Sequence, residues 1–149
     1  MRLSKRCQYA LRAVLELGLR EPGQPVKIQQ IAGAQNIPPR FLEVILNQLR
    51  HAGFVESRRG SEGGYMLAQP VEKLTVGEVM QYIQGPISIT TDDEWATNKS
   101  ESFYGAYAFE RLWENVNSAI SEVCNNITFA DLAKYEKAKK SAATLNYSI

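Results

Sequence analysis

The feature that most constrains the fold of this chain is an amphipathic helix followed at once by a basic, glycine-rich hairpin. Two short extended runs, 54–57 and 65–67, flank the segment Arg58-Arg59-Gly60-Ser61-Glu62-Gly63-Gly64. Two strands joined through a glycine-containing loop make a β-hairpin, and this one carries two permanent cations at its tip. A core-facing stripe at i, i+3, i+4 and i+7 predicts a helix over 39–52 just before it. That stripe is Leu42, Ile45, Leu46 and Leu49. A helix and a basic hairpin presented together predict a winged helix-turn-helix, which holds duplex DNA.

Three more helices are expected around this pair. Apolar residues at helical spacing predict helices over 4–20, 27–35 and 76–84. Pro38-Pro39 can only open the helix that follows, because proline is tolerated in a first helical turn and not deeper. The expected fold class is therefore mainly α with a small β-hairpin wing. Residues 1–84 are predicted to form a winged helix-turn-helix DNA-binding domain.

A long apolar stripe dominates the second half of the chain. We expect a loop over 85–104, dimerisation helices over 105–140 and a flexible tail over 141–149. The first of these helices, about 105–126, would be roughly 33 Å long. It is more apolar than the small N-terminal domain can cover, so a second copy of the chain is the simplest cover. The residues assigned to dimerisation are Phe109, Leu112, Trp113, Val116, Ile120 and Val123.

Charge is divided unevenly between the two halves. Residues 1–60 carry ten Lys/Arg and four Asp/Glu, a net +6, whereas residues 61–149 carry a net −5. A basic N-terminal half suits contact with phosphates. The plainer interpretation is a chance scatter of charge over a solvated surface. The candidate DNA-binding residues are Arg40, Glu43, Asn47 and Arg50 on the outer face of the 39–52 helix, Arg58, Arg59 and Gly60 in the hairpin, and Lys5 near the N-terminus.

The chain has two cysteines, Cys7 and Cys124, and one histidine, His51. Without a CxxC pair, a metal or iron–sulfur site built from Cys and His is not expected. Cys7 follows two cations near a helix start, a setting that can lower a thiol pKa and permit redox switching. The alternative is a small residue packed at the start of the helix.

Other function classes have little support in the sequence. We find no nucleophile–base pair, no paired carboxylates in a pocket-forming context and no phosphate-binding loop before a helix, so we do not expect an enzyme. No apolar run approaches the ~20 residues that cross a bilayer. The N-terminus has no secretory signal pattern. We therefore expect a cytoplasmic protein without membrane contact.

Many short runs match one known family in order. They are Arg2-Leu3-Ser4, Tyr9-Ala10-Leu11, Phe41-Leu42-Glu43, Leu49-Arg50, Ala52-Gly53, Arg59-Gly60, Gly63-Gly64-Tyr65, Thr75-Val76-Gly77-Glu78-Val79, Gly85-Pro86-Ile87, Leu112-Trp113 and Thr128-Phe129-Ala130-Asp131-Leu132. Through them the chain resembles the Rrf2 family of bacterial winged-helix transcription regulators, relatives of IscR, NsrR and CymR.

The resemblance implies a symmetric dimer held by the long helix. Each third helix would enter a major groove, and each wing would approach a minor groove. Glu43 matches the family's acidic base-discriminating residue, and Arg59 matches its wing arginine. The chain departs from the family at Arg40, Pro38-Pro39 and Cys7-Gln8. These departures bear on the operator sequence rather than on DNA binding.

Cluster-binding members of this family place three cysteines between the fourth helix and the long helix. Residues 85–123 contain no Cys and no His, and Trp95, Glu101 and Tyr107 stand in the corresponding places. An iron–sulfur cluster needs thiolate or imidazole ligands. We therefore expect no cofactor and the cluster-free, CymR-like type, which implies control of sulfur and cysteine metabolism.

The expected function is a dimeric, sequence-specific DNA-binding transcription regulator, with repression as the leading interpretation. The alternative is a protein-interaction module that acts through its C-terminal tail, which includes Tyr147 and Ile149. Cluster-free relatives are linked to cysteine synthase, whose active site accepts a partner's C-terminal isoleucine, so such an enzyme is a candidate partner. A small-molecule effector is left open.

Overall fold

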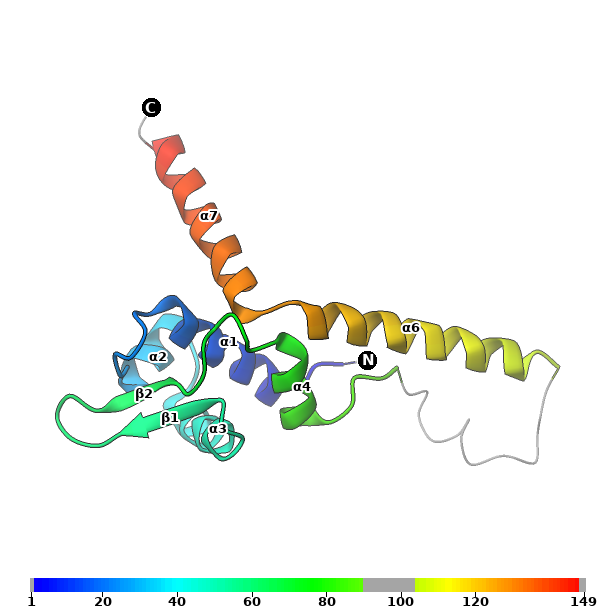
Figure 1. The fold of residues 1–149 in the computed structure, drawn as a ribbon, viewed down its shortest axis with the longest axis horizontal. Helices are drawn as coiled ribbons and strands as arrows, with labels where there is room; N and C mark the ends of the chain where they lie inside the picture. Colours follow the sequence, from blue (N-terminus) through cyan, green and yellow to red (C-terminus); the bar gives the residue numbers. More distant parts are fainter. Residues whose placement is uncertain (1, 90–103, 148–149) are drawn as a thin grey trace.

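The computed structural model describes residues 2–89 and 104–147. The elements are α1 (Lys5–Leu19), α2 (Ile28–Gln35), α3 (Pro39–His51), β1 (Val55–Arg58), β2 (Gly64–Leu67), α4 (Val76–Gln84), α6 (Ala106–Asn126) and α7 (Phe129–Tyr147). Helices α1 to α4 and the β1–β2 hairpin form one body, from which α6 and α7 extend in different directions (Figure 1). The predicted fold class, mainly α with a small hairpin wing, is confirmed.

Local signals account for where several helices begin. The Ser4 hydroxyl accepts a hydrogen bond from the Cys7 N–H at 3.1 Å, as an N-cap does. Before α4, Thr75 and Glu78 bond reciprocally as a capping box. Thr128 and Asp131 repeat the arrangement before α7, and these hydrogen bonds hold the pKa of the Asp131 carboxyl below its ordinary value. The starts of these three helices are therefore set by residues next to them in the sequence.

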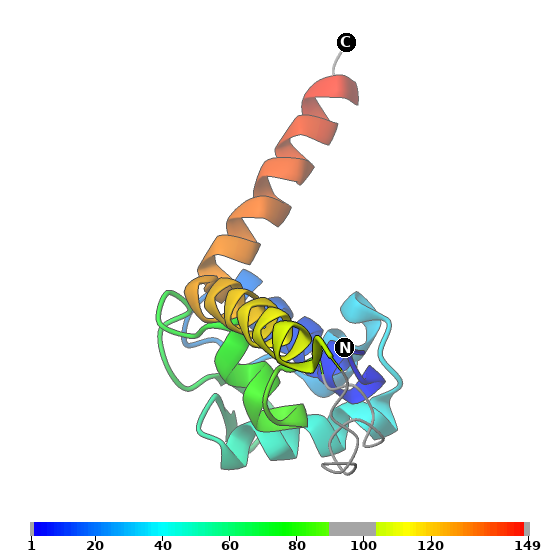
Figure 2. The ribbon, with the colours of Figure 1, turned by 90° about the vertical axis from the view of Figure 1, so that its right-hand side faces the viewer.

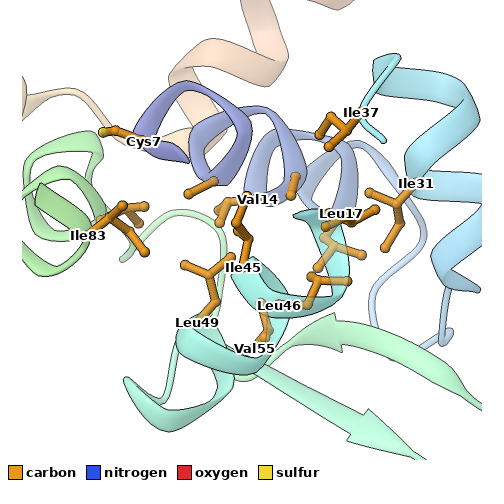
Figure 3. Packing of buried hydrophobic residues seen from close by; sticks show 14 of the residues in the cluster. Cys7, Val14, Leu17, Ile31, Ile37, Ile45, Leu46, Leu49, Val55 and Ile83 are labelled. Atoms are coloured by element: carbon orange, nitrogen blue, oxygen red, sulfur yellow. The ribbon is translucent and has the colours of Figure 1, made fainter. Parts of the chain in front are cut away.

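The core lies between α1 and α3 and fixes the orientation of α3. The inner face of α3 points at α1, and side chains from α2, α4 and β1 close the cluster around it (Figure 3). The α3 contribution is the predicted stripe, and each of its members is at most 2% exposed. Because this face is buried, the opposite face of α3 must look away from the body. The labelled residues of the cluster are Cys7, Val14, Leu17, Ile31, Ile37, Ile45, Leu46, Leu49, Val55 and Ile83.

The hairpin is anchored through its second strand to the segment between α1 and α2. Its strands pair antiparallel from Val55–Leu67 to Arg58–Gly64. On the other edge of β2, Val26 and Tyr65 exchange two backbone hydrogen bonds, each of 2.8 Å. Gly64 has φ +154°, and a Cβ there would lie 2.5 Å from the Val26 carbonyl oxygen. Only glycine permits this close crossing of two backbones, so the wing has a fixed direction relative to α1 and α2.

Helix α7 is longer than expected. The predicted flexible tail over 141–149 is helical as far as Tyr147, and residues 148–149 lie outside the described part of the chain. Residues 141–147 contain neither Gly nor Pro and include Ala142, Ala143 and Leu145, which are good helix formers, so nothing ends the helix at residue 140. The expected loop over 85–104 is described only at residues 85–89 and at residue 104.

Helix α6 keeps an uncovered apolar surface. It packs against α4, yet it has no fully buried residue. Within the predicted dimerisation stripe, Phe109, Leu112 and Val123 are 49%, 45% and 57% exposed. Ile120 and Cys124 pack against the edge of the core. Among the described residues, no helix is long and apolar enough to cross a membrane.

Candidate nucleic-acid interface

Helix α3 presents its polar face on the side of the body opposite α7. Two perpendicular views agree on this, with α3 along the lower edge and α7 rising from the upper one (Figures 1 and 2). Three predicted contact residues, Arg40, Glu43 and Asn47, are all exposed on α3. A protruding helix of about this width fits the major groove of B-DNA. The structure therefore exposes these side chains on the face that could meet base edges.

Arg50 joins α3 to the wing. Its Nη2 donates to Asn47 Oδ1 at 2.8 Å, and its Nη1 donates to Ser57 Oγ in β1 at 3.3 Å. The sequence predicts a DNA contact for Arg50, but the structure gives its guanidinium partners within the protein. Arg50 can thus orient Asn47 and the hairpin as one unit, while it keeps its charge near the exposed face of α3.

The wing tip brings the two predicted arginines together. Arg58 and Arg59 are exposed, and the turn closes with a 3.0 Å hydrogen bond from the Gly63 N–H to the Gly60 carbonyl oxygen. Gly60 has φ +107°, a conformation that L side chains rarely adopt. A side chain at Gly63 would collide with the Arg58 backbone. The glycines therefore allow a narrow tip at which the cations can approach phosphates or a minor groove.

The N-terminal cations differ in their freedom. Lys5 is exposed in the first turn of α1, and a 3.3 Å hydrogen bond from Ser4 N to Gln84 Oε1 holds this turn beside the end of α4. Arg6 instead donates to the Ile83 carbonyl oxygen at 2.9 Å. The structure thus places Lys5 on a different element from α3 and the hairpin, and a DNA contact by Lys5 stays a prediction.

Two neighbouring apolar side chains on the exposed side of α3 were not among the predicted contact residues. Phe41 and Val44 are 61% and 58% exposed, although the rest of the outward face is polar. They lie three residues apart and so share one side of the helix. Helical spacing assigns Leu42, Ile45, Leu46 and Leu49 to the core. The same spacing places Phe41 and Val44 outside the core, so the sequence already indicated that these two side chains are exposed.

Cys7 lies in the core rather than at a reactive surface. The thiol is 0% exposed, and burial raises its pKa, although the nearby Arg6 charge acts in the opposite direction. Burial favours the neutral thiol over the nucleophilic thiolate. The arrangement supports the packing interpretation and weighs against a redox switch at Cys7.

Cys7 is accordingly expected to resist alkylation in the native protein. Iodoacetamide at neutral pH should modify the half-buried Cys124 first, and Cys7 should become reactive only in denaturant. Mass spectrometry of tryptic peptides, with and without urea, gives the two rates. Equal native rates for the two cysteines would show that Cys7 is accessible and would reinstate the redox interpretation.

The cysteine and histidine side chains of this protein do not fit the coordination of an iron–sulfur cluster. The sequence contains two cysteines and one histidine, and Cys7 and Cys124 are both thiols that pack against the hydrophobic core. Among the described residues, no three Cys, His, Asp or Glu side chains gather in a way that could hold a metal. Of the residues standing in the family's cysteine positions, Tyr107 is 72% exposed, while Trp95 and Glu101 lie outside the described ranges.

A helix-turn-helix whose outward helix is joined to a basic hairpin defines a winged helix-turn-helix protein. The model of the Rrf2 family, described as iron-dependent transcriptional regulators, matches residues 3–135. The chain belongs to the Rrf2 family of transcription regulators, and its DNA-binding class follows from this membership.

Known relatives agree with this assignment. The transcriptional regulator CymR of Bacillus subtilis is 30% identical over 145 residues, covering 95% of this chain and 96% of CymR. The solved structure of CymR, described as the global cysteine regulator of B. subtilis, superposes with a TM-score of 0.78 at 30% identity, covering 91% of this chain and 98% of that one. The structure of T. potens IscR superposes with a TM-score of 0.73 at 29% identity, covering 91% of this chain and 88% of the IscR chain.

Proposed function

We propose that this protein is a homodimeric, sequence-specific repressor that binds a two-fold symmetric operator. Each subunit would place α3 in a major groove and the wing against the adjacent backbone or minor groove. The observation that carries this proposal is the connection between α3 and the wing. Arg50 links them on the DNA-facing side, and the Val26–Tyr65 bridge holds the second strand of the hairpin against the segment between α1 and α2. Two reading elements held in one orientation are what recognition of a defined sequence requires.

The exposed stripe of α6 supports the dimer. Several large apolar side chains on one helix remain uncovered within the subunit, including Phe109, Leu112 and Val123. A second α6 related by a two-fold axis would present the same stripe and could cover it, as an isologous interface does. Dimerisation would also supply the second α3 that a palindromic operator needs.

The proposed pathway is the control of sulfur and cysteine metabolism. It rests on 30% identity to CymR along almost the whole chain, together with a ligand set that does not fit an iron–sulfur cluster. Under this proposal the signal reaches the protein through a small molecule or a protein partner rather than through a bound cluster.

A second candidate function uses the C-terminal end. All residues of α7 from Lys134 to Tyr147 are exposed, and the helix points away from the body (Figure 1). This geometry would leave the end of α7, at Tyr147, accessible to the active site of an enzyme such as cysteine synthase. Deletion of Ile149 alone should abolish co-purification with that enzyme, and undiminished co-purification would exclude this role for the tail.

The test that separates the two functions is the specificity ratio on DNA. A regulator should bind its operator at least ~10³-fold more tightly than random duplex at the same salt concentration. A protein-interaction module should bind both weakly, with equal salt dependence. A ratio near one, measured by fluorescence anisotropy with an operator taken from genomic selection, would reject the repressor function.

A further inference from the structure

We propose that Val44, with Phe41 beside it, reads the C5-methyl groups of thymines in the operator. The inference rests on the proposed DNA-binding function and adds a base preference to it. It begins from position on α3. Val44 follows Arg40 by four residues and precedes Asn47 by three, so the three side chains share the outward side of the helix. An apolar group therefore lies in the middle of a polar face.

The exposure of these two side chains calls for an apolar partner. Val44 is 58% exposed and Phe41 is 61% exposed, in the first two turns of α3. Recognition helices contact base edges with their N-terminal residues. In the major groove, the thymine methyl is the apolar group that a base edge presents, and small apolar side chains contact it. Arg40 and Glu43, by contrast, are suited to the polar edges of guanine and cytosine.

The surrounding charge favours DNA over a protein as the occupant of this patch. Arg40 adjoins the two apolar side chains on α3, Arg50 follows later on the same helix, and Arg58 and Arg59 lie in the wing that Arg50 joins to it. The first sixty residues carry a net +6. A polyanion with apolar groups inside its groove complements such a surface. An apolar protein partner would have to bury these cations without phosphates to pair with them.

The stiffness of valine suits a contact of this kind. A β-branched side chain in a helix occupies essentially one χ1 rotamer. Little side-chain entropy is therefore lost when the methyl groups of Val44 pack against a thymine. Valine is also a weaker helix former than alanine, so its place on an exposed helical surface is not explained by stability of the helix.

The test removes single methyl groups from the DNA. In a duplex selected by the wild-type protein, each thymine of a half-site is replaced in turn by uracil, together with its symmetric counterpart, and the Kd is measured at fixed salt. Uracil at one or two neighbouring positions should weaken the binding of the wild-type protein about fourfold per half-site. This is the fold-change that corresponds to ~0.8 kcal/mol for one buried methyl-sized group.

The variant Val44→Ala, tested on the same thymine and uracil duplexes, completes a double-mutant cycle between the protein and the DNA. It should bind the thymine duplex about fourfold more weakly per half-site, and it should lose the uracil penalty at the same positions, because the contact is already absent. Its salt dependence should equal that of the wild type, since no charge is removed. Circular dichroism checks folding, which the exposed position of Val44 should preserve. Val44→Thr, which keeps one γ-methyl group, should retain part of the penalty.

The outcomes separate this inference from the function on which it rests. No uracil penalty at any thymine would overturn the thymine contact while sequence-specific binding stands. Equal penalties in the wild type and in Val44→Ala would assign the methyl contact to another residue and overturn the role of Val44. Failure of the protein to select any duplex would overturn both the inference and the proposed function.

Discussion

Replacing Arg58 and Arg59 together by alanine is expected to weaken operator binding about 100-fold per half-site. Each charge-assisted hydrogen bond to DNA contributes ~1.5 kcal/mol, and two such losses give that factor. If both guanidinium groups of each subunit meet phosphates, the slope of log K against log salt should also fall by about 2 per half-site, which is about 4 for the dimer. Anisotropy titrations at several salt concentrations give both values. The fold should persist, because both side chains are exposed at the hairpin tip.

A matched pair of cations provides the control. Lys137→Ala and Lys139→Ala together remove the same charge from exposed positions on α7, on the far side of the body from α3. This variant should change affinity only slightly, through the long-range field. If the α7 variant weakened binding as much as the wing variant, binding would depend on net charge alone, and a specific role for the wing would be excluded.

Replacing Phe129 by alanine is expected to destabilise the protein by ~3–5 kcal/mol. Phe129 is 0% exposed within the core cluster, and its N–H donates to the Leu74 carbonyl oxygen at 2.9 Å. Truncating a buried phenylalanine removes apolar burial and leaves a cavity. Urea denaturation at fixed protein concentration measures the change, since an oligomer's apparent stability depends on concentration.

Tyr135→Ala is the comparison for the Phe129 variant. Tyr135 lies on the same helix but is 66% exposed, so its loss should change the free energy of unfolding by only ~0.5 kcal/mol or less. Similar destabilisation by both substitutions would mean that α7 is covered along its length, either by the body or by a second subunit. A small effect of Phe129→Ala would contradict the anchoring of α7 to the core.

Local patterns predicted most of the fold because their signals lie within a few residues. The four leucine and isoleucine residues of α3 define its buried face by spacing alone. Thr75 and Glu78 mark the start of α4 in the same way. The glycine-containing loop between two extended runs was enough to predict the hairpin. Each of these features depends on contacts between residues that are close in the sequence, which periodicity and capping rules describe well.

The features that could not be predicted from the sequence are mainly contacts between segments that lie far apart in the chain. The Val26–Tyr65 bridge pairs residues 39 positions apart, and no local pattern near Val26 predicts a strand. The hydrogen bond from Arg50 to Ser57 forms only once α3 and β1 are packed side by side. The end of α7 was placed too early because the cations Lys137, Lys139 and Lys140 are of the kind that favours a helix C-terminus. The spacing of Leu42 and Leu46 already implied that Val44 faces outward, but its relation to the wing needed the structure.

The most direct test of the central claim is the selection of genomic fragments by the purified protein, in reducing buffer without added metal, followed by sequencing. We expect enrichment of a palindrome whose half-sites lie about one helical turn apart, as a symmetric pair of α3 helices requires. That result would establish a regulator that needs no cluster to bind DNA. Sequencing reads with no enriched motif would contradict the account, because α3 and the wing would then not be reading DNA sequence.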